Sequence, residues 1–262
     1  MTPVISMVMF REDVSPNSID LQAYLTRQWP DLPRISNFES DTEAATFHLG
    51  TSTVIIGRMP MPIPWSELEQ PCEMSFLWKN ATSEVRQHVS HWIVSVMDDL
   101  TEIELSTLLS KLTAAVMATS PAAMGVYWGN ASIVIPKEIF IEFVNEILPI
   151  GPPVHIWIDF RVGRNESGTT SGYTIGMKAL GHMEIETLNS TDAPGDLKER
   201  LTALAGYLLE NGPVIQNGHT VGGDELERIS VVYSKSEFGH EGEVMRLVYE
   251  QTETRKPWWK PW

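Results

Sequence analysis

The sequence predicts an α+β fold, with mixed or antiparallel sheets that carry amphipathic helices mainly on one face. Two observations lead to this class. Apolar stretches of strand length recur along the whole chain, and amphipathic stretches of helix length separate some of them but not others. Turn signals rich in glycine join several strands directly, as in antiparallel hairpins. Because helices and strands alternate irregularly, a doubly wound parallel sheet is not expected.

The strands of the first half are predicted from runs of apolar residues. Val4–Phe10 is apolar almost throughout, the pattern of a strand covered on both faces, and residues 91–97 have the same character. Gly129 and Asn130 form a turn signal of hairpin type. Strands are therefore expected over residues 4–10, 44–50, 53–59, 91–97, 124–128 and 132–135.

The helices of the first half are predicted from their caps and apolar stripes. Ser15 and Pro16 indicate a helix start, since serine is a good N-cap and proline suits the first helical position. Thr101 and Glu104 have the spacing of a capping box. The helix after them carries an apolar stripe of five residues, Leu105, Leu108, Leu109, Leu112 and Val116. A further helix is expected to begin at Pro136 and end at Pro149.

The last third of the chain is predicted to be a strand meander followed by a helix. Residues 154–162, 171–180 and 183–188 have the pattern of consecutive antiparallel strands. A helix over residues 194–210 follows, with apolar residues on one face. The stretch over residues 149–153 is rich in proline and suggests a boundary between an N-terminal lobe (1–150) and a C-terminal lobe (151–253), with a tail at 254–262. A single continuous domain is the alternative.

Composition and charge exclude several classes of function. The chain has 262 residues and a formal charge of −15, which argues against binding to bare nucleic acid or anionic lipid. No apolar run approaches the roughly 18 residues of a membrane helix, and the N-terminus lacks the pattern of a signal peptide. We therefore expect a cytoplasmic protein with neither a nucleic-acid nor a membrane partner; its oligomeric state is left open.

The residues that bind metals or cofactors are sparse. The chain has one cysteine, Cys72, so a multi-cysteine metal site is excluded. His88 and His91 have the spacing of helical metal ligands but fall at the start of a predicted strand, where such residues point to opposite faces. The Gly-rich stretch that contains His219 and Asp224 has no lysine and is read as tight turns. We expect no cofactor and no metal site.

Several phrases of the sequence resemble a bacterial family described as a domain of unknown function, DUF4261. The best of them, residues 171–181, reads SGYTIGMKALG and is followed by Glu184 and Glu186. Residues 125–128 before it and residues 217–222 after it fit the same layout. The resemblance extends over about residues 120–235. It implies no activity, because none defines the family, and no catalytic residue follows from it.

The candidate site is a polar sheet face. Along the predicted strand 154–162, His155, Asp159 and Arg161 alternate with apolar residues, so they share one face. If the next two strands pair in order, Lys178, Glu184 and Glu186 join that face. A histidine beside carboxylates can act as a general base, and arginine with lysine can bind an anion. The alternative interpretation is a solvated face with cross-strand ion pairs.

Two functions follow from these patterns. The first is a non-enzymatic interaction protein whose acidic surface, including Glu184 and Glu186, meets a basic protein partner. The second is a hydrolase-type enzyme in which His155 and Asp159 are the catalytic candidates, with Arg161 and Lys178 as binding residues. The charge and the lack of a catalytic motif favour the first. The three tryptophans of the tail suggest either an interface anchor or a segment that packs on its own domain.

Overall fold

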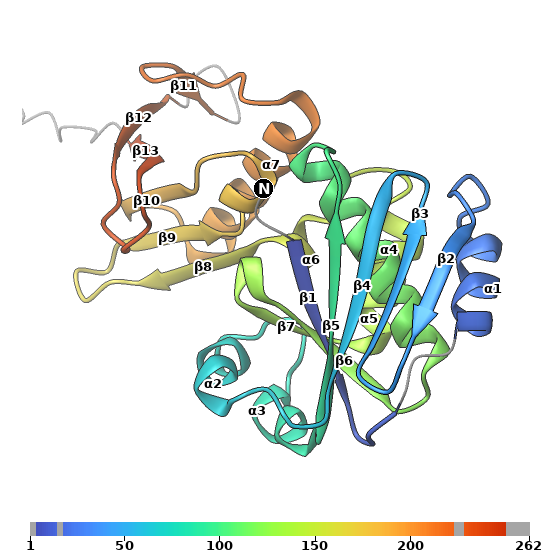
Figure 1. Cartoon of the computed structure of the whole chain (residues 1–262). Coiled ribbons are helices and arrows are strands. Elements are labelled where there is room, and N and C mark those ends of the chain that lie inside the picture. The colour runs from blue at the N-terminus through green and yellow to red at the C-terminus, as the bar shows by residue number, and fades with distance from the viewer. Residues whose placement is uncertain (1–3, 15–17, 223–227, 250–262) are drawn as a thin grey trace, which may run out of the picture.

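The strands of the molecule form two sheets, seen in the computed structural model of residues 4–14, 18–222 and 228–249 (Figure 1). Sheet A has seven strands in the order β2-β3-β4-β5-β1-β6-β7, and every neighbouring pair is antiparallel. Its strands are β1 (Val4–Phe10), β2 (Ile35–Ser40), β3 (Ala44–Leu49), β4 (Ser52–Met59), β5 (Ser90–Met97), β6 (Ala123–Trp128) and β7 (Ile133–Pro136).

Sheet B has six strands in the order β11-β12-β13-β10-β9-β8. The pair β10–β13 is parallel and the other pairs are antiparallel, so the sheet is mixed. Its strands are β8 (Asp159–Arg164), β9 (Thr170–Ile175), β10 (Ile185–Ser190), β11 (Thr220–Val221), β12 (Ile229–Lys235) and β13 (Glu243–Tyr249).

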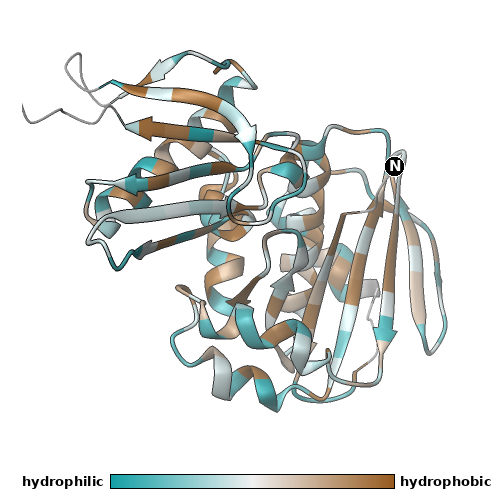
Figure 2. Ribbon diagram, turned by 90° about the vertical axis from the view of Figure 1, so that its left-hand side faces the viewer, coloured by the Kyte–Doolittle hydropathy of each residue, from teal (hydrophilic) through white to brown (hydrophobic). Residues whose placement is uncertain are grey.

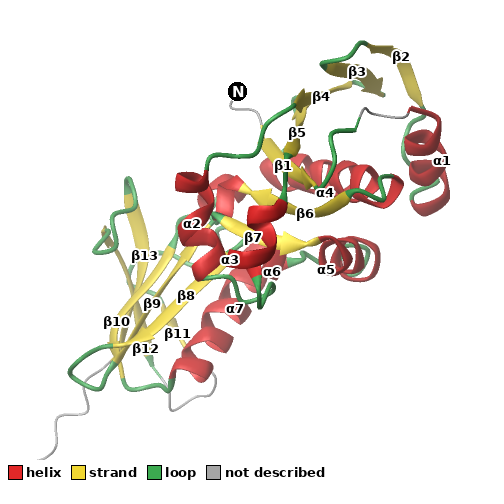
Figure 3. Cartoon of the chain, turned by 90° about the horizontal axis from the view of Figure 1, so that it is seen from below, coloured by secondary structure: helices red, strands yellow, loops and turns green. Residues whose placement is uncertain are grey.

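Helices cover the two sheets unequally. Helix α4 lies along one side of sheet A together with α1 and α5, α2 and α3 lie on the other side near β6 and β7, and α7 packs on sheet B (Figure 3). Their bounds are α1 (Ser18–Gln28), α2 (Trp65–Glu73), α3 (Ala81–Glu84), α4 (Glu102–Thr119), α5 (Lys137–Glu142), α6 (Val154–Trp157) and α7 (Pro194–Asn211). None of the described helices combines the length and the hydropathy that a membrane span needs.

The α+β prediction is confirmed, and so are most of the elements. The capping box at Thr101 and Glu104 is present at the start of α4, with each residue accepting the backbone N–H of the other. The hairpin at Gly129 joins β6 and β7. All five residues of the α4 stripe are buried. The predicted cap at Ser15 and Pro16, and the tail at 254–262, lie outside the described residues.

The predicted strand over residues 154–162 is wrong in its first part. Residues 154–157 form the short helix α6, and the strand begins only at Asp159. Pro152 and Pro153 precede the helix, and Trp157 at its end is buried in the core, so tertiary packing overrides the alternating pattern. Strand β9 likewise ends at Ile175, before the predicted 180, because Gly176 adopts a positive φ of 119° and residues 178–180 form a 3₁₀ turn.

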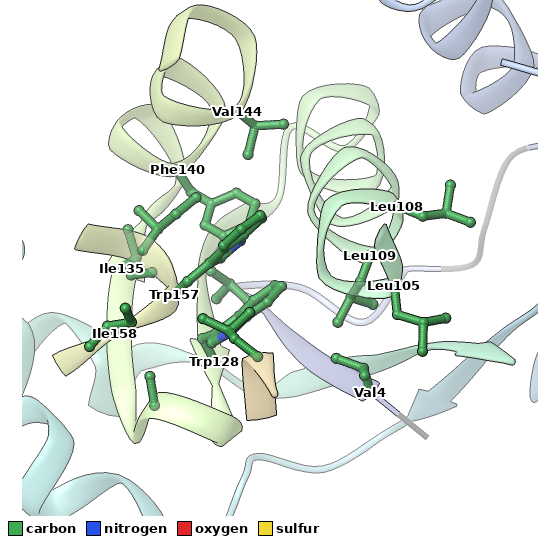
Figure 4. Close-up of a cluster of buried hydrophobic side chains, with 14 of the residues drawn as sticks. Val4, Leu105, Leu108, Leu109, Trp128, Ile135, Phe140, Val144, Trp157 and Ile158 are labelled. Atoms are coloured by element: carbon green, nitrogen blue, oxygen red, sulfur yellow. The ribbon is translucent and has the colours of Figure 1, made fainter. Parts of the chain in front are cut away.

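One hydrophobic core runs through the residues of both predicted lobes. All strands of sheet A come from residues before 150 and all strands of sheet B from residues after 151. Even so, Trp157 and Ile158 pack beside Trp128 and Phe140 in a single cluster (Figure 4). The apolar residues, brown in Figure 2, extend along the strands of sheet A and the helices behind them.

The apolar faces of α4 and α7 can be tested by truncating one leucine in each. Leu108 is 8% exposed and Leu201 is fully buried. Alanine at either position is expected to lower the free energy of unfolding by about 2–5 kcal/mol, because each removes buried methyl groups and leaves a cavity. Urea unfolding measures the free energy of unfolding of each variant and of the wild type. A loss below about 1 kcal/mol at one site would contradict the packing of that helix.

Candidate functional site

The structure brings part of the predicted polar face together. Strands β8, β9 and β10 pair in order, and the register places Arg161 opposite Tyr173 and Tyr173 opposite Glu186. Glu186 in turn is opposite Arg246 of β13. Residues opposite one another share a face, so one polar row crosses four strands. Asp159 lies on the same face, two residues before Arg161.

His155, Lys178 and Glu184 do not join this row. His155 lies on helix α6 and Lys178 in the 3₁₀ turn after β9. Glu184 precedes β10, and its carboxylate accepts a hydrogen bond from Thr174 Oγ1 at 2.7 Å. Thr174 is opposite Phe160, on the other face of the sheet. The prediction that all six residues share one face is therefore wrong for these three.

His155 and Asp159 nevertheless meet at one pocket, at the start of the edge strand β8. Lys198 of α7 and the segment 74–77 also line it. Burial raises the pKa of Asp159, although the hydrogen bond and charge of Arg161 act in the opposite direction. Burial and the charge of Lys198 lower the pKa of His155, and burial lowers the pKa of Lys198. Sequence analysis missed Lys198, since its electrostatic interaction with Asp159 depends on the packing of α7.

The geometry of this pocket indicates that its side chains stabilise the fold and does not favour a catalytic role. Its volume is about 30 Å³, room for about two water molecules. Asp159 accepts a 2.7 Å hydrogen bond from Arg161 Nε, and the His155 ring makes edge contacts with Phe143 and Phe160. Among the described residues no hydrogen bond joins His155 to a carboxylate that would orient its ring as a general base.

The expectation that Glu184 and Glu186 belong to an exposed acidic surface is wrong. Glu184 is 6% exposed and Glu186 is fully buried. Besides Thr174, Glu184 accepts the backbone N–H groups of Gly176 and Lys178, so it holds the turn after β9. Both carboxylates are therefore bonded within the fold, whereas the sequence predicted that they would face solvent.

Glu186 is buried because the connection between β12 and β13 folds over it. Ser236 Oγ and the Glu237 N–H donate to its carboxylate, and Arg246 lies 3.6 Å away. Phe238 from the same connection stacks on Tyr173, with ring centroids 4.4 Å apart. Of the two predicted binding cations, Arg161 is buried, whereas Lys178 is exposed and pairs with Glu241 at 3.7 Å.

The remaining candidates are integrated in the fold around α2. His88 Nε2 accepts a 2.8 Å hydrogen bond from the Ile63 N–H, and His91 Nδ1 bonds the carbonyl of Met61 at 2.8 Å. Burial raises the pKa of Cys72 to about 11, so its thiol is not activated. Within residues 4–14, 18–222 and 228–249, no group of three or more His, Cys, Asp or Glu side chains could hold a metal ion. Asp224 lies outside those residues.

The burial of His88 makes stability depend on pH. Burial lowers its pKa from the ordinary value near 6.5, and protonation of Nε2 would remove the acceptor for Ile63. The unfolded state then binds more protons below about pH 6.5, so the free energy of unfolding should fall as the pH drops from 7.5 to 5.5.

The variant His88→Gln isolates this contribution. Its amide oxygen can accept the same hydrogen bond but does not titrate. Urea unfolding at the two pH values should show a smaller loss in this variant than in the wild type. Equal losses would mean that His88 does not contribute to the pH dependence.

A second candidate site lies on sheet A, on the side of the sheet opposite α4. We call this side the open face. It consists of the residues of β1, β3, β4 and β5 that face away from α4: Ile5, Met7, Thr46, His48, Thr53, Ile55, Gly57, Ile93, Ser95 and Met97. Met97 is exposed and the other nine are half-buried. None of them is an Asp, Glu, Lys or Arg. Among the described residues, Ile5, Ile55 and Ile93 pack against neither hydrophobic cluster.

The register makes the open face continuous. Ser95 lies between Ile55 and Ile5, and Ile93 lies between Gly57 and Met7. Met97 at one end is 43% exposed. Helices α2 and α3 pack near β6 and β7, and their cluster also contains Met9 and touches Met7 of β1 (Figure 3). They leave Ile5 of β1 and Ile55 and Ile93 of β4 and β5 outside that cluster. The expectation that β1 is covered on both faces therefore holds around Met9, which is fully buried in the cluster beneath α2, but not at Ile5, which packs against neither cluster.

Acidic residues surround the open face. Glu39, Asp41 and Glu43 lie on or next to the edge strand β2, and Asp98 and Asp99 follow the end of β5. Four of these five carboxylates are exposed, and Asp98 is half-buried. Arg58, close to Glu43, is paired with Asp13. An apolar centre with a charged rim is the usual anatomy of a protein interface.

The fold and these surfaces define an α+β protein with two sheets, a polar row across sheet B and, on sheet A, an open face that contains no Asp, Glu, Lys or Arg. Residues 173–248 match a family described as a domain of unknown function, DUF4261. That segment runs from β9 to β13, so the resemblance seen in the sequence is confirmed over this part of the chain. No curated protein and no solved structure matches the chain.

Proposed function

We propose that this chain is an interaction protein that binds a basic partner protein through the open face of sheet A. The observation that carries the proposal is that three isoleucines on the central strands of this sheet pack against no described core cluster. A strand that is apolar on both faces normally has a layer on each side. The partner would supply the second layer.

The sign of the partner's charge follows from the rim and from the whole chain. Carboxylates lie at both ends of the open face, and the chain carries a formal charge of −15. A second copy would bring like charges together at the rim, whereas a basic partner would gain from them. The same field would accelerate association, and salt would reduce this effect as the Debye length falls to about 8 Å at physiological strength.

The hydrolase alternative has weaker support. The pocket at His155 and Asp159 holds about 30 Å³, whereas ligand sites are roughly ten times larger. Asp159 is engaged by Arg161, and Glu184 and Glu186 have structural partners. An interaction function would not require any of these side chains to give up its hydrogen bonds within the chain.

The test uses a synthetic amphipathic helix with a leucine stripe flanked by lysines, compared with the same peptide flanked by glutamates. We expect the lysine peptide alone to bind, with an association rate that falls as salt is raised. Ile93→Ser should weaken binding about tenfold or more, because it removes apolar area from the centre of the face. The matched control is Ile150→Ser, at a loop isoleucine that is 82% exposed.

Each outcome bears on a separate part of the proposal. Equal affinity of Ile93→Ser and wild type would reject the open face as the binding surface. Equal affinity for the lysine and glutamate peptides would reject the basic partner. Absence of saturable binding by either peptide would reject the interaction function in the form proposed.

A further inference from the structure

A cavity of about 340 Å³, widely open to solvent, lies at the end of sheet A where β5 leads into α4. It is on the α4 side of the sheet, across from the open face. Leu32, Pro33, Leu49, Leu100 and Leu108 form its apolar walls, and Asp98, Glu104 and Lys111 supply its charges. Volume, apolar walls and a few polar groups are the usual features of a small-molecule site.

The charges of the cavity are separated along one side of α4. Glu104, Leu108 and Lys111 follow one another at helical spacing, so they form a single stripe. Glu104 and Lys111 are seven positions apart in sequence, which places them about 10 Å apart along the helix. Asp98 lies at the glutamate end. The cavity therefore has a negative end, an apolar middle and a positive end.

Both ends have capacity for a ligand. Glu104 uses Oε2 for the capping box with Thr101, and Oε1 is not part of that box. Lys111 is half-buried, and burial lowers its pKa, with the charge of Asp31 opposing this. Among the described residues its ammonium has one ring contact, 5.8 Å from the centre of Trp29, and no ion pair within 4.0 Å.

We infer that this cavity binds a small zwitterion whose ammonium and carboxylate groups are separated by an apolar body. The ammonium group would lie at Glu104 and Asp98, and the carboxylate at Lys111. Two kinds of compound share this chemistry: short apolar peptides with free ends, and ω-amino acids. The site shares only Asp98 with the rim of the open face and none of the ten residues of that face, so its failure would leave the proposed function standing.

The experiment titrates the full chain with Leu-Leu and with 6-aminohexanoate, each by calorimetry and by amide chemical shifts. We expect one molecule to bind per chain, with shift changes confined to the cavity. N-acetyl-Leu-Leu-amide, which lacks both charges, should bind about tenfold more weakly or worse, because charge-assisted hydrogen bonds are lost. Tighter binding of Leu-Leu would indicate a peptide as the ligand, and tighter binding of 6-aminohexanoate would indicate an ω-amino acid.

Two variants test the charged ends. Lys111→Met keeps the apolar stem and removes the charge, and Glu104→Gln removes the charge while retaining a capping box, which glutamine also forms. Each should weaken Leu-Leu or 6-aminohexanoate about tenfold. Lys79→Met and Glu102→Gln, outside the cavity lining, are the matched controls and should bind like wild type.

The inference is overturned by any of three results. The first is that neither probe binds saturably at millimolar concentration, and the second is that the blocked peptide binds as well as the free one. The third is that both charge variants bind like wild type. Circular dichroism establishes that each variant is folded, so that a loss of binding reports on the cavity itself.

Discussion

Replacing Trp157 with alanine is expected to lower the free energy of unfolding by about 3–5 kcal/mol. Trp157 is 1% exposed, and its indole N–H donates a 2.8 Å hydrogen bond to Ser110 Oγ of α4. The ring lies beside Phe140 and Trp128 (Figure 4). Alanine would remove a large apolar surface and leave a cavity at the point where α6 meets the core behind sheet A.

The shape of the unfolding transition tests the shared core as well. Because one cluster contains residues from both predicted lobes, urea unfolding followed by far- and near-ultraviolet circular dichroism should shift as a single transition. The control is Ser110→Ala, which leaves the indole N–H without its partner and should cost about 1–3 kcal/mol. Two separate transitions in the wild type, or a loss below that of Ser110→Ala, would contradict this account.

Glu186→Ala is expected to cost about 3 kcal/mol, near the lower end for breaking a buried ion pair. The carboxylate is fully buried and accepts hydrogen bonds from Ser236 and the Glu237 N–H. Its loss would leave these donors unsatisfied and would separate Arg246 from one of its two carboxylates. Arg246 keeps Glu237 at 3.5 Å and is 17% exposed, which moderates the effect.

The matched control for this prediction is Glu241→Ala. Glu241 is 94% exposed and pairs with Lys178 at the surface, so its removal should leave stability unchanged within error. Urea unfolding of both variants is the measurement. Similar losses in the two variants would show that the connection over β10 does not depend on Glu186.

Local sequence patterns predicted most of the fold. The capping box at Thr101, the stripe of α4 and the apolar runs of β1 and β5 are short-range signals, and they are confirmed. Strand β2 was not predicted, because most of its side chains are exposed and only its pairing with β3 identifies it as a strand. Residues 154–157 were predicted to be a strand because polar and apolar residues alternate there. The burial of Trp157 in the core favours the helix instead.

The candidate site was harder to predict for the same physical reason. The register that aligns Arg161, Tyr173 and Glu186 follows from strand pairing, which the sequence suggested correctly. The covering connection over Glu186 and the position of Lys198 depend on contacts between residues distant in sequence. The open face did leave a signal: two strands read as apolar on both sides in a chain whose helices lie mainly on one side.

We expect the open face to influence how the chain behaves at high concentration. Its apolar centre would allow two copies to stack, and the negative charge of the chain keeps them apart while the carboxylates are ionised. Near the sequence pI of about 4.8 this repulsion disappears. Acidification should therefore favour reversible aggregation, and a partner seated on the open face would act as a protective cover during storage as well as in binding.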